Sequence, residues 1–234
     1  MRNDTTALVE KYGGTVVGAS AYPFPQTSDF SSLLLTAQTS GADVCAFANG
    51  GADTANSVKQ ANEFGLGSTM KLVTLQMLVS DVHAIGLQGA AGFNLTETFY
   101  WDLNDGTRVF SARLKSAMPD TRPGMLHAGA YSATLHYLKV AQEMGIADAK
   151  ASGRTTVARM KATPTEDDCF GKCAIRADGR RLMPAYLFQV KSPAESKGPW
   201  DYYKLVATTP ADQAVRRLTD GKCPLIGPDG SMRT

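Results

Sequence analysis

Apolar and polar positions along the first hundred residues alternate between two periods, one typical of helices and one of strands. Short apolar or β-branched runs predict strands at 15–20, 44–48, 71–75 and 93–101. Between them, helical spacing predicts helices at 5–12, 30–39 and 52–64 and a short helical turn at 81–85. The run at 44–48 is continuously apolar, which favours a parallel strand covered on both faces. The alternation of strands and helices predicts an α/β fold with a doubly wound, mainly parallel sheet.

The second half of the chain has a different pattern. It predicts helices at 107–118, 125–144 and 155–161, and strands at 173–176, 186–191 and 200–207. In the long helix, Ala128, Tyr131, Leu135 and Leu138 fall on one face. The order along the chain is therefore βαβ units first, then helices, then strands.

Composition excludes several classes of protein. The 234 residues are 43% hydrophobic and 20% charged, a globular balance, and the net charge of +2 comes without any basic run. General electrostatic binding of nucleic acid is therefore disfavoured. The uncharged stretches at 30–42 and 82–96 are shorter than the ~20 apolar residues that a spanning helix needs. The polar N-terminus carries no signal peptide in the sequence as it stands.

The four cysteines indicate no metal site. Cys45 lies in an apolar run and reads as a buried hydrophobic residue. Cys169 and Cys173 flank a turn, where either a local disulfide or two reduced thiols fit the sequence. A zinc site is disfavoured because no histidine lies near this pair.

No catalytic motif is present. The chain lacks the glycine patterns of dinucleotide and phosphate loops, the serine elbow of hydrolases and the paired histidines of zinc proteases. His127 and His136 lie about 180° apart around a helix, so they share no ligand face. These absences favour a binding protein over an enzyme.

Candidate ligand residues follow two predicted strands, because ligands of open α/β sheets lie at the carboxyl ends of the strands. At Asn49-Gly50-Gly51-Ala52-Asp53, backbone amides at a helix start can receive an anion, and Asn49 or Asp53 can hold an amine or hydroxyl. A tight turn with a helix cap is the alternative. Gln76 follows the next strand, with a surface glutamine as the alternative.

Three aromatic residues complete the candidate set. Tyr100 and Trp101 end a strand that leads into the second pattern, where they can line a cleft or pack between domains. Tyr131 lies on the apolar face of the long helix, a position typical of core packing as well as of ligand contact.

An ordered set of stretches resembles a known family. They are K-Y-G-G-T-V-V-G at 11–18, Y-P at 22–23, T-S-D-F-S-S-L-L at 27–34, G-A-D-V at 41–44, N-G-G-A-D at 49–53, Q-A at 60–61, F-G-L at 64–66, F-Y-W-D-L-N at 99–104, A-G-A-Y-S-A at 128–133, I-R-A-D-G-R at 175–180 and V-K-S-P at 190–193. Together they resemble periplasmic solute-binding proteins of ABC importers, of the branched-chain amino-acid-binding type, from about residue 8 to residue 225.

The resemblance implies a type I periplasmic-binding fold, in which two α/β lobes joined by three crossing segments close on a small solute. It implies the second lobe at 1–97, part of the first lobe at 98–185, and a crossing and return segment at 186–234. It also implies a periplasmic location, delivery of the solute to a membrane permease, no catalysis and no cofactor. The ligand loops of the second lobe match Asn49–Asp53 and Gln76, the crossing strand matches Phe99–Trp101, and a cleft helix of the first lobe matches Tyr131.

Two departures from the family pattern carry expectations of their own. Gln76 stands where an acidic residue often helps to hold an amine, which leaves room for an uncharged solute or an organic acid, aromatic acids included. The chain begins inside the first helix of the second lobe and resembles the C-terminal portion of a longer protein. With the first lobe incomplete, we expect exposed apolar stripes at Val109/Phe110/Leu114 and Leu135/Leu138, and self-association or pairing with the missing part.

Two other readings remain open. Type I binding folds also occur as ligand-sensing domains of receptors. A Rossmann-like enzyme that uses Gly50-Gly51 as a cofactor turn is the further alternative.

Overall fold

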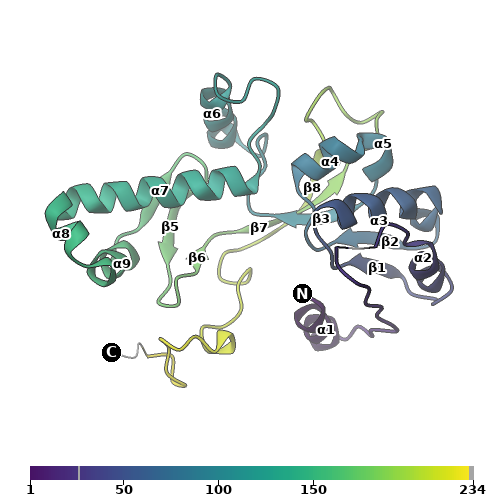
Figure 1. Cartoon of the computed structure of the whole chain (residues 1–234), viewed down its shortest axis with the longest axis horizontal. Coiled ribbons are helices and arrows are strands. Elements are labelled where there is room, and N and C mark those ends of the chain that lie inside the picture. Colours follow the sequence, from purple (N-terminus) through teal and green to yellow (C-terminus); the bar gives the residue numbers. More distant parts are fainter. Residues whose placement is uncertain (26, 232–234) are drawn as a thin grey trace. The chain divides into compact units, whose positions relative to one another are not determined.

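The computed structural model describes residues 1–25 and 27–231. The chain divides into two compact units (Figure 1). The first holds Met1–Glu97 and Leu187–Ala207, and the second holds Thr98–Tyr186 and the chain from Thr208 onward. The chain therefore passes from one unit to the other three times. The assignment of lobes at 1–97, 98–185 and 186–234 stays a prediction.

The first unit is built on a five-stranded, mainly parallel sheet in the order β1-β2-β3-β7-β8. Its strands are β1 (Val44–Phe47), β2 (Lys71–Thr74), β3 (Asn94–Glu97), β7 (Ala185–Val190) and β8 (Tyr203–Thr209), the last two running across the boundary between the units. β1 pairs with β2 and β2 with β3 in parallel, so their carboxyl ends lie at one edge of the sheet. The predicted parallel sheet is confirmed for these three strands.

The helices of the first unit come before β1 or between β1 and β3, and all but the last of them were predicted. They are α1 (Arg2–Lys11), α2 (Ser31–Gln38), α3 (Ala52–Glu63), α4 (Val79–Ile85) and α5 (Leu87–Ala90), with a 3₁₀ turn η1 at Leu66–Ser68. In Figure 1, α3 and α4 lie over one face of the sheet. Val58 of α3 and Leu72 of β2 are buried in the core, together with Phe93 and Leu95.

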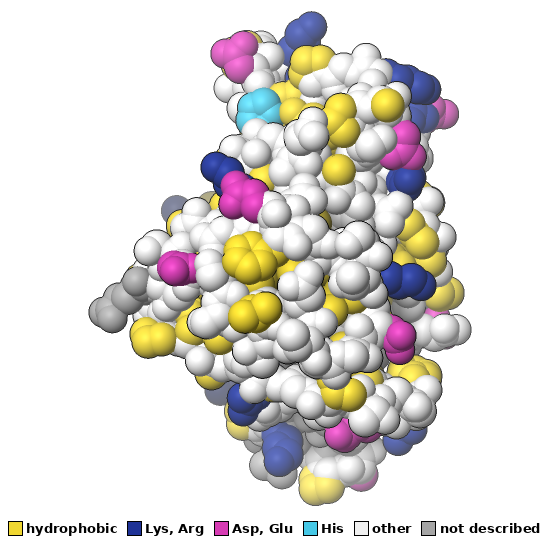
Figure 2. Space-filling model, turned by 90° about the vertical axis from the view of Figure 1, so that its right-hand side faces the viewer, with side chains coloured by type: hydrophobic (Ala, Val, Ile, Leu, Met, Phe, Trp, Pro, Cys, Tyr) yellow, Lys and Arg dark blue, Asp and Glu magenta, His cyan; other side chains and the backbone are white. Residues whose placement is uncertain are grey.

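Two sequence predictions about this sheet are wrong. Residues 15–20 form no strand, and β1 is not covered on both faces, because Val44 is 49% exposed. β-Branched residues favour an extended backbone, but a strand needs a hydrogen-bonded neighbour, and in residues 1–25 and 27–231 β1 lies at the edge of the sheet beside β2 alone. Val17 therefore stays exposed, α1 buries no residue, and hydrophobic side chains reach the surface on this side of the molecule (Figure 2).

The second unit packs helices against a small antiparallel sheet. Its helices are α6 (Asp105–Leu114), α7 (Met125–Met144), α8 (Ile146–Ala151) and α9 (Gly153–Ala162), and its sheet is β4 (Thr165–Asp167), β5 (Gly171–Ile175) and β6 (Arg181–Leu182), with a 3₁₀ turn η2 at Thr219–Gly221 near the C-terminus. α8, β4 and β6 were not predicted. No helix in the described ranges is long and apolar enough to cross a bilayer.

A buried polar network joins α7 to this sheet. The Asp167 carboxylate of β4 accepts a hydrogen bond from Ser132 of α7 and an ion-pair contact of 3.1 Å from the Arg181 guanidinium of β6. Arg181 also donates to Ser132, and it stacks on the Phe170 ring at 4.7 Å. α7 and the sheet are thus held together by charge as well as by packing.

The predicted apolar stripes are only partly exposed. Val109 and Leu138 lie in solvent, Leu138 with 56% of its surface exposed. Phe110, in contrast, is fully buried in a cluster with Phe99, Ala128 and Cys169, and Leu114 packs against that cluster. The prediction of exposure is wrong for Phe110 because α6 turns this residue towards α7 and the segment after β3.

Candidate functional site

The turn between β1 and α3 carries the first group of candidate residues. Gly51, immediately before α3, has a φ of +61°, which a residue with a side chain rarely adopts. The Asn49 side-chain amide donates to Ser57 Oγ at 2.9 Å and to the Asp53 carbonyl at 3.4 Å, and its oxygen accepts from Thr54 Oγ1 at 3.0 Å. Asn49 thus braces the turn and fixes where the first amides of α3 point.

Gln76 lies beside this turn. A Cβ atom added to Gly50 would lie 3.3 Å from Gln76 Oε1, so the ends of β1 and β2 approach closely here because position 50 has no side chain. Gln76 is exposed. The structure therefore brings together Asn49, Gly50, Gly51, Asp53 and Gln76, five of the eight candidate residues, within the first unit.

Tyr22 joins the same cluster, and sequence reasoning missed it as a site residue. Its hydroxyl lies near the side chains of Asn49 and Asp53, and both affect its pKa. Burial raises the pKa of Tyr22 above its usual value, the hydrogen bond and negative charge of Asp53 add to that rise, and the hydrogen bond to Asn49 opposes it. The available signal was position, because Tyr22 follows the β-branched run at 15–20 just as Asn49 follows β1.

The loop that carries Tyr22 is pinned to α3. The Tyr22 ring meets the buried Phe30 ring edge to face, with 5.0 Å between centroids. Gln60 of α3 accepts a hydrogen bond from the Phe30 amide and donates one to the Ser28 carbonyl, both at 2.8 Å. Tyr22 is therefore held in place by side chains of the same unit.

Asp53 is the acidic member of this cluster. Only 3% of its surface is exposed, and its Oδ2 atom receives no hydrogen bond from the residues that the structure describes. The residue lies in the first turn of α3, where the helix dipole stabilises negative charge. The cluster thus offers backbone amides, a phenol hydroxyl, a neutral amide and one buried carboxylate.

The other three candidate residues, Tyr100, Trp101 and Tyr131, belong to the second unit. Tyr100 is buried, and Trp101 is partly exposed, with the Arg122 guanidinium 5.3 Å from its ring centroid. Tyr131 packs 5.0 Å from Phe110 and its hydroxyl accepts a hydrogen bond from Arg113 at 3.1 Å. Tyr131 therefore contributes to the core of this unit, and Trp101 presents part of an aromatic face to solvent.

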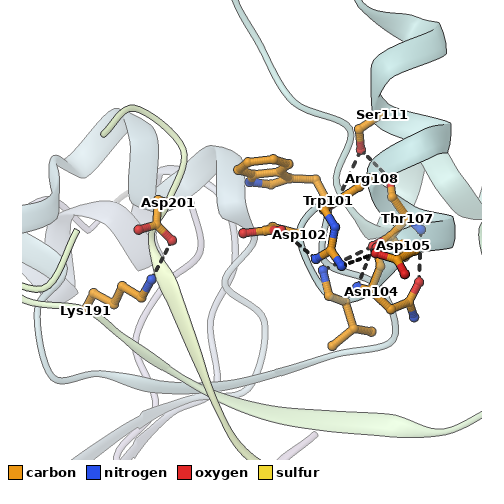
Figure 3. Close-up of polar contacts among 10 residues, drawn as sticks. Trp101, Asp102, Asn104, Asp105, Thr107, Arg108, Ser111, Lys191 and Asp201 are labelled. Atoms are coloured by element: carbon orange, nitrogen blue, oxygen red, sulfur yellow. Dashed lines mark hydrogen bonds and ion pairs between the residues drawn. The ribbon is translucent and has the colours of Figure 1, made fainter. Parts of the chain in front are cut away.

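Charged residues hold the segment after Trp101 (Figure 3). Arg108 lies between two carboxylates, Asp102 at 2.9 Å and Asp105 at 2.6 Å. Asn104 begins α6 and exchanges hydrogen bonds of 3.0 Å with Thr107. These contacts hold the turn between Trp101 and the N-terminal end of α6 in one conformation. Figure 3 also shows Lys191 and Asp201 of the first unit, paired at 2.5 Å.

A cavity of about 300 Å³ lies within the second unit. Thr98, Asn104, Asp167, Asp168, Cys169 and Tyr186 are among the residues that line it. Asp168 is paired with Arg113 at 2.8 Å, and Asp167 belongs to the buried network. The charges at this cavity are therefore already neutralised by residues of the chain.

The cysteines are free thiols. Cys169 and Cys173 are buried and form no disulfide. Of the two possibilities that the sequence left open, the structure shows the pair of reduced thiols. Cys45 is only half-buried, because β1 is an edge strand, and burial still raises the pKa of its thiol. In residues 1–25 and 27–231, no three His, Cys, Asp or Glu side chains gather where they could hold a metal ion.

Comparison with known proteins gives a consistent result. Residues 1–199 match the periplasmic binding protein family. A periplasmic binding protein from Burkholderia mallei is 40% identical, with a TM-score of 0.85, and a branched-chain amino acid ABC transporter periplasmic ligand-binding protein from Burkholderia xenovorans is 35% identical, with a TM-score of 0.83. The alignments cover 96% of this chain and 58% and 59% of those structures. Among curated proteins, none matches the chain.

A more distant structure shares the fold. The solute-binding protein of an ABC transporter from R. palustris, in complex with 4-hydroxybenzoate, is 22% identical, with a TM-score of 0.73, over 90% of this chain and 56% of its own. The type I periplasmic-binding fold is thereby confirmed, with one lobe incomplete. The family consists of solute-binding proteins rather than enzymes, and it implies a periplasmic location. The chain belongs to the periplasmic binding protein family, of the type that serves ABC transporters of branched-chain amino acids.

Proposed function

We propose that this chain captures a small amino acid or organic acid, aromatic acids included, between two lobes and delivers it to the permease of an ABC importer in the periplasm. The observation that carries the proposal is the polar cluster at the ends of β1 and β2, where the turn before α3 lies near Tyr22 and Gln76 and leads into Asp53. In open α/β sheets, ligands bind at this edge.

We assign the polar contacts of the solute to the first unit. At Gly51 no atom would lie within 4 Å of an added Cβ, so a carboxylate can approach the start of α3 there. Asn49 acts by holding this turn, and Gln76 and Asp53 offer neutral and charged hydrogen-bonding groups beside it. In the second unit, Trp101 supplies an aromatic face, while Tyr100 and Tyr131 support it from the core.

Two kinds of solute deserve testing, because the related structures point to both. The Burkholderia xenovorans protein is described as a branched-chain amino acid protein, and the R. palustris protein holds 4-hydroxybenzoate. Both solute classes carry a carboxylate, which suits the amides at Gly50 and Gly51. Since the chain spans 58–59% of the two Burkholderia structures, the activity of the whole protein is part of this proposal.

The test is a binding screen by thermal shift and titration calorimetry with aliphatic amino acids and aromatic acids. It uses this chain and a chimera that adds the part of the Burkholderia mallei protein that the chain does not match. We expect saturable binding of at least one solute by the chimera and weaker binding by the chain alone. Chemical turnover of a solute, or no saturable binding by either protein, would refute the proposal.

A matched pair of glycine variants locates the site. In Gly50→Val, the new side chain meets the Gln76 amide, so binding should weaken about tenfold or more. In Gly129→Ala on α7, the added methyl group meets no atom within 4 Å, so binding should stay unchanged. Equal effects of the two substitutions would place the solute elsewhere.

A further inference from the structure

The Asp53 carboxylate is an unusual group for the interior of a unit. Only 3% of the surface of Asp53 is exposed, and its Oδ2 atom receives no hydrogen bond from the described residues. A buried polar atom without a partner destabilises the folded state, and more so when it is charged. Such atoms are rare in native proteins, and none of the described residues supplies a partner here.

The surroundings of Asp53 hold the carboxylate in one place. Tyr22 lies near it, Asn49 donates to the backbone carbonyl of Asp53, and Tyr22 is fixed in turn by the edge-to-face contact with Phe30. Asn49 is tied to Ser57 and Thr54 of α3. A group fixed in this way recognises a ligand with little loss of side-chain entropy.

Charge separates Asp53 from the other polar groups of the cluster. Gln76 and Asn49 are neutral amides, so a solute ammonium meets its counter-charge at Asp53 and not at position 76. A hydroxyl group of a solute can donate to the same oxygen atom. The absence of an acid at position 76 therefore does not by itself select solutes that carry only a carboxylate.

We propose that Asp53, positioned by Tyr22, is the specificity-determining residue of the site and selects solutes that carry a hydrogen-bond donor, either an ammonium or a hydroxyl group. This inference rests on the proposed function. A solute without the donor leaves the Asp53 oxygen buried and unpaired, and a site of that kind rejects it strongly.

The test compares two pairs of probes that differ in the donor alone. Leucine and 4-methylpentanoate differ in an ammonium group, and 4-hydroxybenzoate and benzoate differ in a hydroxyl group. Calorimetry on the chimera described above should show one donor-bearing probe binding about 10- to 100-fold more tightly than its partner, the range expected for a hydrogen bond to a charged group. The pair that shows the difference identifies the donor.

Asp53→Asn keeps the size of the side chain and removes its charge. We expect this variant to reduce the discrimination to less than about threefold, while Asp43→Asn, at an exposed position of the same unit, leaves it unchanged. Saturable binding with equal discrimination in the wild type and Asp53→Asn would overturn this inference alone. No saturable binding of any solute by the wild type would overturn the proposed function, and this inference with it.

A ligand-free measurement checks the contact between Tyr22 and Asp53. The Tyr22 titration is obtained as the ultraviolet difference between the wild type and Tyr22→Phe. Because the charge of Asp53 contributes to the raised pKa of Tyr22, Asp53→Asn should lower that pKa. A Tyr22 titration that is the same with and without the Asp53 charge would overturn the positioning role of Tyr22.

Discussion

Removal of the Arg181 guanidinium tests how the second unit is held together. Arg181→Met keeps much of the length of the side chain, including its packing on Phe170, and removes the charge that faces Asp167. The Asp167 carboxylate then stays buried without its cation, because only 3% of its side chain is exposed. We expect the sheet β4-β5-β6 to loosen from α7.

The magnitude follows from burial and from the remaining contacts. Breaking a buried ion pair costs about 3–5 kcal/mol when one charge is left without compensation. Two observations place Arg181→Met below that range. The Arg181 side chain keeps 14% exposure, and the Cys169 and Phe170 amides still donate to Asp167 Oδ1 at 3.0 and 2.8 Å. The expected loss is about 2–3 kcal/mol.

Hydrogen exchange read by mass spectrometry measures this loss in the second unit alone, whichever unit unfolds first in urea. Amides of α7 and β5 should exchange about 30- to 150-fold faster in Arg181→Met. Asp167→Asn combined with Arg181→Met should restore part of the protection, because no buried charge is left unpaired. An increase below about threefold, or strict additivity of the two substitutions, would show that the network contributes no coupling.

The same network makes the second unit sensitive to acid. Burial acts to raise the pKa of Asp167, but the hydrogen bonds from Ser132 and the Phe170 amide and the charge of Arg181 lower it below the usual value. The folded unit therefore binds the Asp167 proton less readily than the unfolded chain does. Its contribution is present above about pH 4 and is lost as pH falls through the lowered pKa. In Arg181→Met this acid-dependent loss should shrink.

Three further predictions concern other parts of the chain. Tyr203→Phe removes the hydroxyl that donates to the buried Glu97 carboxylate at 3.0 Å, and should cost about 1–3 kcal/mol in urea unfolding; no change would contradict the contact. Alkylation mapped by mass spectrometry should reach the half-buried Cys223 before Cys169, whose pKa is raised mainly by burial and further by nearby carboxylates. Leu138→Glu on the exposed stripe of α7 should reduce self-association in analytical ultracentrifugation, and a wild type that is monomeric at all concentrations would refute that expectation.

Local patterning predicted most elements because helix and strand periods are properties of short segments. The helix at Met125–Met144 has the predicted bounds, and strands near 71–75 and 186–191 lie within a residue or two of β2 and β7. The wrong or missing strand predictions have two causes, the lack of a neighbouring strand and short length. The run at 15–20 has the composition of a strand and forms none, and β4 and β6 are strands of three and two residues, too short to carry a period.

The candidate site divides in a similar way. The sequence placed Asn49, Gly50, Gly51, Asp53 and Gln76 after predicted strands. Parallel strands have their carboxyl ends at the same edge of a sheet, so residues that directly follow such strands are expected there. It did not indicate Tyr22, because that residue reaches the cluster through a loop held by Gln60 and Phe30.

The sequence by itself determined the succession of helices and strands, the solute-binding family and the strand ends that carry polar groups. These depend on residue order, which the chain keeps whether folded or not. Only the tertiary structure decided that Asn49 braces a turn, that Asp53 is buried with an unpaired oxygen atom, and that Phe110 is core while Leu138 is not. Burial and hydrogen bonding depend on which distant segments meet, and no local pattern of side chains specifies that.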